Sequence, residues 1–331
     1  MLETILPITL TILIGFIITL LLVPSVSKFM FKHGIIGIDV HKLDKPKIPE
    51  LCGITIVLGV TVSAIIFSLF YPEQNMWILA FVSSTLIAAI VGILDRITKI
   101  GPRLKPALVA LGALPIIFLA VYNPYPEFPF IGVTRLTIIY PLLIPIALAV
   151  TANSVNMLDV FNGSMTGTCS IAILGMIICM LIMGRVDAAA LAAGLLGSLL
   201  AFHIFNKYPA KIFAGDVGSL FIGASIGVLA IYGRIEVAAI TAMMPHIMNA
   251  FYGLATVGRL YERKEISNRP IRVLEDGRLD VNKDSKAPIT LARMILAQRP
   301  LKEFEVTRRM FILSAVSAIL AVFTQLLIIW C

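Results

Sequence analysis

Ten apolar stretches constrain this chain more than any other feature, because each is long enough to cross a bilayer as a helix of about 20 residues. They cover residues 4–27, 53–71, 76–94, 106–122, 138–153, 168–184, 188–205, 217–233, 236–257 and 309–331. The sequence therefore predicts an all-α integral membrane protein with ten transmembrane helices. We expect residues 1–331 to form a single polytopic membrane domain.

The composition agrees with this fold class. The chain is 59% hydrophobic and only 14% charged, whereas about a quarter of the residues in soluble domains are charged. Its mean hydropathy is +0.96. The first apolar stretch has no basic segment before it and no small-residue cleavage site. We therefore expect a retained helix rather than a signal peptide.

The lysines and arginines predict how the chain is oriented. An even number of spans places both termini on one side, and all but three of the 27 basic residues lie in the loops of the other side. The three exceptions are Arg135, Arg185 and Arg234. Because basic residues near span ends stay in the cytoplasm, both termini are expected outside. The formal charge of +8 then indicates anionic lipid headgroups or an anionic substrate rather than nucleic acid, since no base-stacking aromatics interleave the basic residues.

The loops carry few other signals of structure. The largest predicted inner loop covers residues 258–308, and Asp276-Gly277 lies between partly alternating segments in it, which indicates a small β-hairpin. The segment that follows, PITLARMILAQRPLKEF, is expected to form an amphipathic helix on the inner surface. The four cysteines form no CxxC pair, so we expect neither a disulfide framework nor a zinc site. No GxxxxGK[ST] motif is present, which excludes a P-loop pump.

Polar residues gather at several of the predicted inner span ends. Asn153, Asn156 and Asp159 follow one another at intervals of three and would project from one helical face. Amide and carboxylate oxygens are the ligands that a hard cation prefers. The structural alternative is a helix end whose polar side chains bond their own backbone. Asp216 heads an apolar helix between Gly215 and Gly218, where an ionisable group is costly and usually functional, although it could also serve as an N-cap.

Basic residues lie close to these acidic groups in the inner loops. Asp95 ends the third span and Lys105 begins the fourth, and bases so placed could clamp phosphates. Glu50 belongs to a charged, proline-bearing loop, and Arg269 and Arg272 precede the expected hairpin. A positively charged inner loop is the structural alternative for each of them. Together, oxygen ligands and phosphate binders on one membrane face indicate phosphoryl transfer.

The same residues carry a resemblance to a known family. The motifs KIPELCG, NSVNMLDVFNG, FAGD, MPHIMNAFYGL and RPIRVLEDGRL, with the segment from Asp95 to Lys105, resemble the polyprenyl-phosphate N-acetylhexosamine-1-phosphate transferases over nearly the whole chain. The resemblance is to the dolichol branch, in an archaeal form. It implies ten spans, a cytoplasmic active site, and transfer of N-acetylglucosamine 1-phosphate from UDP-N-acetylglucosamine to a dolichyl or other polyprenyl phosphate, with release of UMP. Such a reaction begins the lipid-linked oligosaccharides used in protein N-glycosylation.

The resemblance also implies roles for individual residues. Asn156 and Asp216 would hold Mg²⁺, for which Mn²⁺ could substitute, and Lys105 would contact phosphate. With Asp95, these three are the expected catalytic residues. The expected substrate-binding residues share the nucleotide, sugar or lipid-phosphate parts of the site. They are Asn162 and Gly163 at the uracil, Phe213 stacked on it, Arg269 at the diphosphate and sugar, and Glu50, with Asp95, near the polyprenyl phosphate. Arg272, Asn153 and Asp159 are also expected to bind substrate, without a more particular role.

Two departures from the family pattern leave alternatives open. Family members commonly have a second aspartate where this chain has Arg96 after Asp95. We expect no general base to be needed, since the lipid phosphate is already ionised. Asp159 resembles the bacterial branch, whereas Asn162 resembles the dolichol branch. A different UDP-N-acetylhexosamine or undecaprenyl phosphate therefore remains an alternative, and a transporter of an anionic solute is the alternative from another class. The resemblance further implies a homodimer, in the cell membrane or, in a eukaryote, the endoplasmic reticulum.

Overall fold

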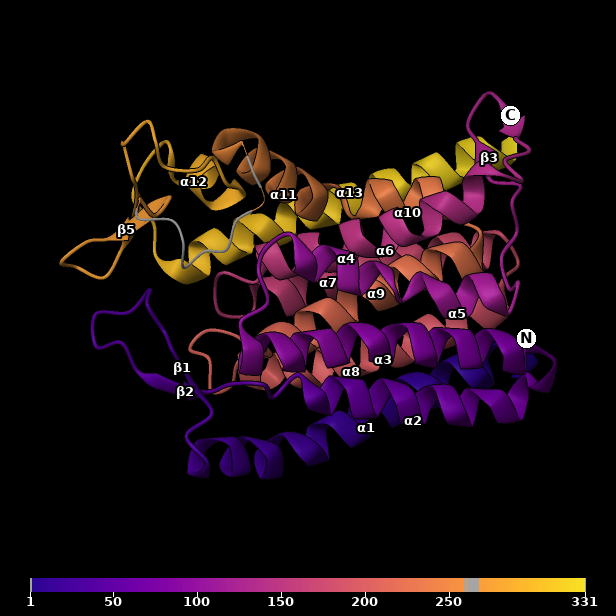
Figure 1. Ribbon diagram of the computed structural model, residues 1–331, viewed down its shortest axis with the longest axis horizontal. Helices are drawn as coiled ribbons and strands as arrows, with labels where there is room; N and C mark the ends of the chain where they lie inside the picture. Colours follow the sequence, from indigo (N-terminus) through magenta and orange to yellow (C-terminus); the bar gives the residue numbers. More distant parts are fainter. Residues whose placement is uncertain (1, 259, 261–267, 331) are drawn as a thin grey trace.

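The computed structural model describes residues 2–258, 260 and 268–330, which form a bundle of helices that run along its longest axis (Figure 1). The long helices are α1 (Leu2–Lys32), α2 (Ile54–Phe70), α3 (Asn75–Thr98), α6 (Ile139–Leu158), α7 (Ser164–Ile182), α8 (Val186–Asn206), α9 (Gly215–Gly233), α11 (Met244–Val257) and α13 (Glu303–Trp330). The short helices are η1 (Pro72–Gln74), α4 (Leu104–Ala110), α5 (Ala113–Phe118), α10 (Glu236–Ala242) and α12 (Leu291–Leu296).

Three small antiparallel strand pairs lie at the two ends of the bundle. Strand β1 (Ile36–Ile38) pairs with β2 (Lys47–Pro49), and β5 (Ile271–Val273) pairs with β6 (Leu279–Val281). These two pairs and α12 lie at one end, whereas β3 (Glu127–Phe128), its partner β4 (Gly132–Val133) and both chain termini lie at the other (Figure 1). The termini therefore share one end of the molecule, as the even number of predicted spans requires.

Helix α9 forms the centre of the bundle because small residues let its neighbours approach its backbone. A Cβ on Gly92 of α3 would lie 2.5 Å from the backbone of Asp216, and a Cβ on Gly53 would lie 2.5 Å from Gly218 Cα. A Cβ on Gly223 would lie 2.5 Å from Ala152 Cα in α6. Every residue of α9 from Val217 to its end is buried. This packing brings the ends of α2, α3 and α6 together around the start of α9.

Fewer continuous helices than predicted are long enough to cross a membrane. Among the residues that the structure describes, seven helices are long and apolar enough to span a bilayer, or eight if the bent pair α10 and α11 is one span. Two shorter apolar segments, Ile54–Phe70 and Leu104–Phe118, add to these. Within its described residues the protein is mostly helical, with seven or eight membrane-capable helices rather than ten continuous ones.

Prolines account for the interruptions. The predicted span 106–122 is divided into α4 and α5, and the break lies four residues before Pro115, where a proline ring clashes with the preceding turn. The predicted span 236–257 is bent by 69° between α10 and α11, directly before Pro245. Proline removes a backbone donor in both places, so neither helix continues unbroken.

The last inner connection also differs from the expectation. The helix expected over PITLARMILAQRPLKEF extends over only six residues, as α12, because the chain turns before Pro300. Helix α13 then begins at Glu303, inside the predicted loop 258–308. The predicted loop residues 259 and 261–267 lie outside the described part of the chain.

Candidate functional site

The start of α9 is fixed by the segment that follows β2. The Phe213 N–H donates to Pro49 O at 2.8 Å, and the N–H groups of Cys52 and Gly53 donate to Phe213 O and Ala214 O at 3.1 and 3.0 Å. Gly215 then takes φ +67°, a left-handed conformation that glycine adopts without strain. These contacts hold Phe213 and the first turn of α9, with Asp216, at the strand-bearing end of the bundle.

A lysine joins two carboxylates from different helices at this position. Lys105 Nζ lies 2.8 Å from Asp95 Oδ2 and 2.7 Å from Asp216 Oδ2. Asp95 comes one turn after Gly92, whose lack of a side chain lets α3 lie against the backbone of Asp216. Three residues that the sequence predicted as catalytic are therefore in direct contact. They are separated by up to 121 positions in the chain.

A cavity of about 640 Å³ opens beside this cluster. Eight of the predicted site residues line it: Glu50, Asn156, Asp159, Asn162, Phe213, Asp216, Arg269 and Arg272. They come from the segment after β2, the end of α6 and its following loop, the start of α9 and the loop that bears β5. The remaining predicted residues, Asp95, Lys105, Asn153 and Gly163, are not among the lining residues. Lys105 still reaches the cavity wall through Asp216.

The end of α6 divides the three polar residues predicted to share a face. Helix α6 ends at Leu158, so Asn156 lies in its last turn and Asp159 lies just beyond it. Asn153 lies one turn earlier, where its Nδ2 donates to Ala149 O at 2.7 Å. Asn153 therefore bonds its own helix, as the structural alternative for this stretch expects. Asn156 and Asp159 are the members that reach the cavity.

Asn162 is buried in a polar network that the sequence did not predict. Its Oδ1 accepts from Lys42 Nζ at 2.8 Å and from the Ala210 N–H at 2.9 Å. Its Nδ2 donates to Asp39 Oδ2 at 3.1 Å, and its backbone N–H donates to Glu303 Oε1 at 2.7 Å. Four segments of the chain thus meet at one amide. The neighbouring Gly163 lies directly before α7 and has φ +73°, a left-handed conformation that favours glycine.

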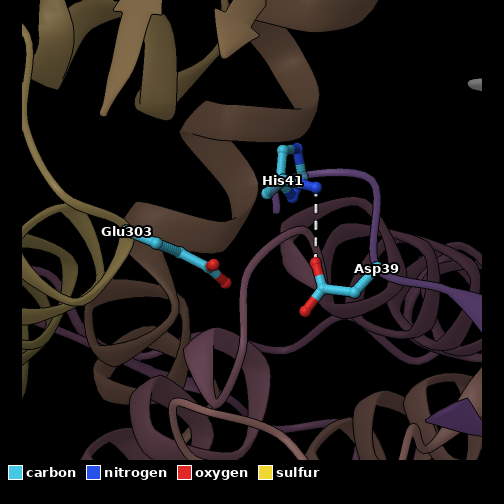
Figure 2. Close-up of side chains that lie close together, drawn as sticks. All are labelled: Asp39, His41 and Glu303. Atoms are coloured by element: carbon cyan, nitrogen blue, oxygen red, sulfur yellow. Dashed lines mark hydrogen bonds between the residues drawn. The ribbon is translucent and has the colours of Figure 1, made fainter. Parts of the chain in front are cut away.

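The ammonium of Lys42 neutralises this network. It lies 2.6 Å from Asp39 Oδ2 and 3.0 Å from Glu303 Oε2, and 4.6 Å from the centre of the Tyr208 ring. Burial lowers the pKa of Lys42, but the hydrogen bond that it donates to Asp39 and the charge of Glu303 outweigh this effect, so the pKa is raised above its ordinary value. Lys42 is therefore charged at neutral pH. Figure 2 shows the carboxylates of Asp39 and Glu303 turned toward each other beside His41.

Several of these residues were missed or discounted from the sequence. Asp39 and Lys42 belong to the same charged, proline-bearing loop as Glu50, for which a positively charged inner loop is the structural alternative, and Glu303 was not singled out. Asn249 also lines the cavity, where its Nδ2 donates to Met157 O and its Oδ1 accepts from the Leu291 N–H. An asparagine inside an apolar stretch was the available signal for Asn249. Glu303 offered none, since it lies among many charged residues.

The two arginines before the hairpin differ in their surroundings. Arg272 donates from Nε and Nη2 to Asp280 Oδ2, at 3.1 and 2.7 Å, across the β5–β6 pair. Arg269 is exposed and lines the cavity, and its carbonyl accepts from Asn282 Nδ2 at 2.8 Å. Arg269 is therefore the arginine whose guanidinium is better placed to meet an anionic ligand.

Arg96 occupies the position of the family's second aspartate and has a structural contact there. Its Nη1 lies 3.0 Å from Glu50 Oε2, and its Nη2 donates to Ile36 O at 3.2 Å. Arg96 thus connects the end of α3 to β1 and to the cavity residue Glu50. This arrangement replaces a possible base with a cation that pairs with a carboxylate.

The donor atoms around the start of α9 fit a hard divalent cation. Asp216 supplies a carboxylate and Asn156 an amide oxygen to the same cavity. Oxygen ligands of this kind suit Mg²⁺ and Mn²⁺. The predicted metal ligands are therefore chemically suited to the ion.

Comparison with known proteins places this geometry in context. Residues 76–234 match the family model described as glycosyl transferase family 4. A protein of Saccharolobus solfataricus, provisionally named a UDP-N-acetylglucosamine–dolichyl-phosphate N-acetylglucosaminephosphotransferase, is 32% identical over 97% of this chain and 98% of its own. A provisionally named glycosyltransferase of Methanocaldococcus jannaschii is 31% identical over 95% and 96%. The phospho-N-acetylmuramoyl-pentapeptide-transferase of Bacillus licheniformis is 30% identical over 69% and 75%.

Proposed function

Because the chain belongs to glycosyl transferase family 4, we propose that it transfers N-acetylglucosamine 1-phosphate from UDP-N-acetylglucosamine to a dolichyl-type polyprenyl phosphate and releases UMP. Transfer of a sugar 1-phosphate to a polyprenyl phosphate follows from the family and its named relatives. The particular sugar, nucleotide and lipid are the proposal, and the archaeal relatives support them.

One observation carries this proposal. A single cavity of about 640 Å³ is lined by Asp216, Asn156 and Arg269, and Lys105 lies at its wall. Two anionic substrates must approach each other in phosphoryl transfer, so fixed positive charge and cation ligands are needed in the same place. The two amide or carboxylate ligands and the two basic residues supply both.

The proposed chemistry is one displacement at phosphorus. An oxygen of the ionised lipid phosphate forms a bond to the sugar-linked phosphorus. The bond from that phosphorus to the bridging oxygen breaks, and the bridging oxygen leaves as part of UMP. Lys105 would bind a phosphate oxygen, and Arg269 would hold the diphosphate. Mg²⁺ held by Asn156 and Asp216 would offset the negative charge of the transferring group. Proton abstraction is not required, so the proposed reaction can proceed with Arg96 in place of a second aspartate.

Release of UMP tests the function directly. Purified protein in lipid nanodiscs would receive Mg²⁺, UDP-N-acetylglucosamine and a polyprenyl phosphate, and UMP would be separated and measured. We expect release by the parent and a loss of about a hundredfold or more in Asp216→Asn. Asp276→Asn is the matched control, because Asp276 lies in the exposed hairpin turn. The function is wrong if the parent releases no UMP, or if Asp216→Asn is as active as Asp276→Asn.

A panel of donors decides between related activities. UDP-N-acetylglucosamine should be preferred over other UDP-N-acetylhexosamines, and a dolichyl phosphate over undecaprenyl phosphate. A reversed preference would assign the chain to another branch of the same family.

We also propose that the chain crosses the membrane ten times, with the cavity in the cytoplasm. The seven long helices, the bent pair and the two shorter apolar segments together would supply the crossings. A cysteine introduced at Lys45, in a background without the native cysteines, should be protected in intact cells from an impermeant maleimide. A cysteine at Arg135 should be labelled, and the reverse pattern would overturn the orientation.

A further inference from the structure

The side-chain amide of Asn162 has one possible orientation, because its three partners accept no other. Lys42 Nζ and the Ala210 N–H can only donate, so both must face Oδ1. A carboxylate oxygen of Asp39 can only accept, so it must face Nδ2. Exchange of the amide oxygen and nitrogen would place two donors against a donor and a carboxylate against an oxygen. The chemistry of the partners therefore fixes the assignment.

This orientation leaves a single hydrogen-bonding group for a ligand. Two donors occupy the two lone pairs of Oδ1, and Asp39 takes one of the two hydrogens on Nδ2. Among the described residues, no further acceptor meets the second hydrogen. Asn162 lines the cavity. A ligand that reaches this side chain therefore meets a donor, and never an acceptor.

Glu303 contacts Lys42, the lysine that donates to the side-chain amide of Asn162. Its Oε2 lies 3.0 Å from Lys42 Nζ, while its Oε1 accepts the backbone N–H of Asn162 at 2.7 Å. The carboxylate is 4% exposed, so both contacts are shielded from water. Glu303 lies in the first turn of α13, a helix that reaches the cavity through Met310 and contributes no predicted site residue.

The same carboxylates, together with His41, have the composition of a metal site. Ligand atoms of Asp39, His41 and Glu303 lie within 4.8 Å of one another (Figure 2). The Lys42 ammonium, however, contacts both carboxylates at 2.6 and 3.0 Å and already neutralises them. Both carboxylates also hold Asn162, Asp39 through the Asn162 side chain and Glu303 through the Asn162 backbone N–H, so this cluster can position that residue.

We propose that Lys42, Asp39 and Glu303 are positioning residues that present Asn162 as a hydrogen-bond donor toward the C4 carbonyl oxygen of the uracil, and that they thereby set the preference of the protein for uracil over cytosine. Cytosine has an amino group at C4, where uracil has a carbonyl oxygen, and both bases share the carbonyl at C2. A donor that faces position 4 therefore distinguishes the two bases. The inference rests on the proposed function, because it assumes that the base of the donor nucleotide reaches Asn162.

Binding of UMP and CMP to the purified protein in nanodiscs tests the inference. The parent should bind UMP about tenfold more tightly than CMP, as expected for one hydrogen bond to a neutral group. Lys42→Met should abolish most of this preference, because the amide can then turn. Glu303→Gln should reduce it in the same direction but less, since the glutamine still accepts from the Asn162 N–H and keeps the shape of the site.

Two matched substitutions control for the chemical change itself. Lys45→Met replaces an exposed lysine of the same loop, and Glu305→Gln replaces a glutamate one half-turn along α13. Both should keep the preference of the parent for UMP. If Lys42→Met does not fold, Glu303→Gln carries the test, and thermal melting shows which variants are folded.

Steady-state kinetics separate positioning from a general structural role. A positioning role raises the KM for the UDP-sugar in Lys42→Met and Glu303→Gln and leaves the KM for the polyprenyl phosphate unchanged. The inference is overturned if both variants keep the UMP preference of the parent within twofold, or if both KM values rise together. Should the parent itself release no UMP from UDP-N-acetylglucosamine, the proposed function has failed, and the nucleotide preference then stands or falls by the binding measurement.

Discussion

Gly92→Ala should disable the enzyme through a single added methyl group. A Cβ at this position would lie 2.5 Å from the carbonyl carbon and oxygen of Asp216 and from the nitrogen of Val217. Ordinary van der Waals contact begins at 3.4 Å, and all three atoms belong to the backbone, so no side chain can turn aside. Helix α3 must therefore move from α9 by about 0.9 Å, at a cost of about 1–3 kcal/mol in stability.

The movement acts on the site as well as on stability. Asp95 follows Gly92 on α3 and contacts Lys105 at 2.8 Å, while Lys105 contacts Asp216 at 2.7 Å. A displacement of nearly 1 Å between the two helices pulls these contacts apart, and such a misplacement can cost about a hundredfold in rate. We expect kcat for UMP release to fall by about that factor, with a smaller change in melting temperature.

The control for Gly92→Ala is Gly101→Ala. Gly101 lies in the loop between α3 and α4, and an added Cβ would meet nothing within 4 Å. This variant should match the parent in both kcat and melting temperature. The packing argument would be refuted by a Gly92→Ala enzyme whose kcat stays within twofold of the Gly101→Ala enzyme.

Further predictions concern charged groups at the cavity. Lys105→Met should lower kcat by about a hundredfold and lower the melting temperature, because two carboxylates lose the cation between them; normal kcat would exclude a role at phosphate. Arg269→Ala should raise the KM for the UDP-sugar more than Arg272→Ala does, because the guanidinium of Arg272 is already paired with Asp280. Equal increases in KM would contradict this. Hydrogen bonds from Arg272 lower the pKa of Asp280, so the β5–β6 pair keeps this stabilisation above about pH 4 and loses it as the pH falls through the lowered native value. Hydrogen exchange of the hairpin amides, corrected for intrinsic rates, should show this acid sensitivity in the parent and not in Asp280→Asn.

The sequence predicts where helices lie better than where they break. Apolar length alone located the helices, since a bilayer demands a minimum run of apolar residues. Each proline can be read from the sequence, but its effect on the helix cannot. Three of them lie inside continuous helices, namely Pro7, Pro24 and Pro145. Pro115 and Pro245, in contrast, lie next to a break and a bend. Neighbouring helices decide whether a freed carbonyl can be accommodated. Sequence alone does not contain that information.

The candidate site shows the same division. Asp95, Lys105 and Asp216 stand out in the sequence because ionisable groups next to apolar runs are rare. Their mutual contact depends on backbone approach at Gly92 and Gly53, which only the packed bundle reveals. The partners of Asn162 are harder still, because Lys42 and Glu303 are 261 positions apart and resemble ordinary surface charges.

Both chain termini lie at the end of the bundle opposite the cavity (Figure 1). A tag, fluorophore or surface tether attached to either one would stand a full helix length away from Asp216 and the hairpin. The molecule could therefore be immobilised by its ends with the cavity facing the solution, so that nucleotide and inhibitor binding can be followed on a sensor surface without obstruction by the attachment.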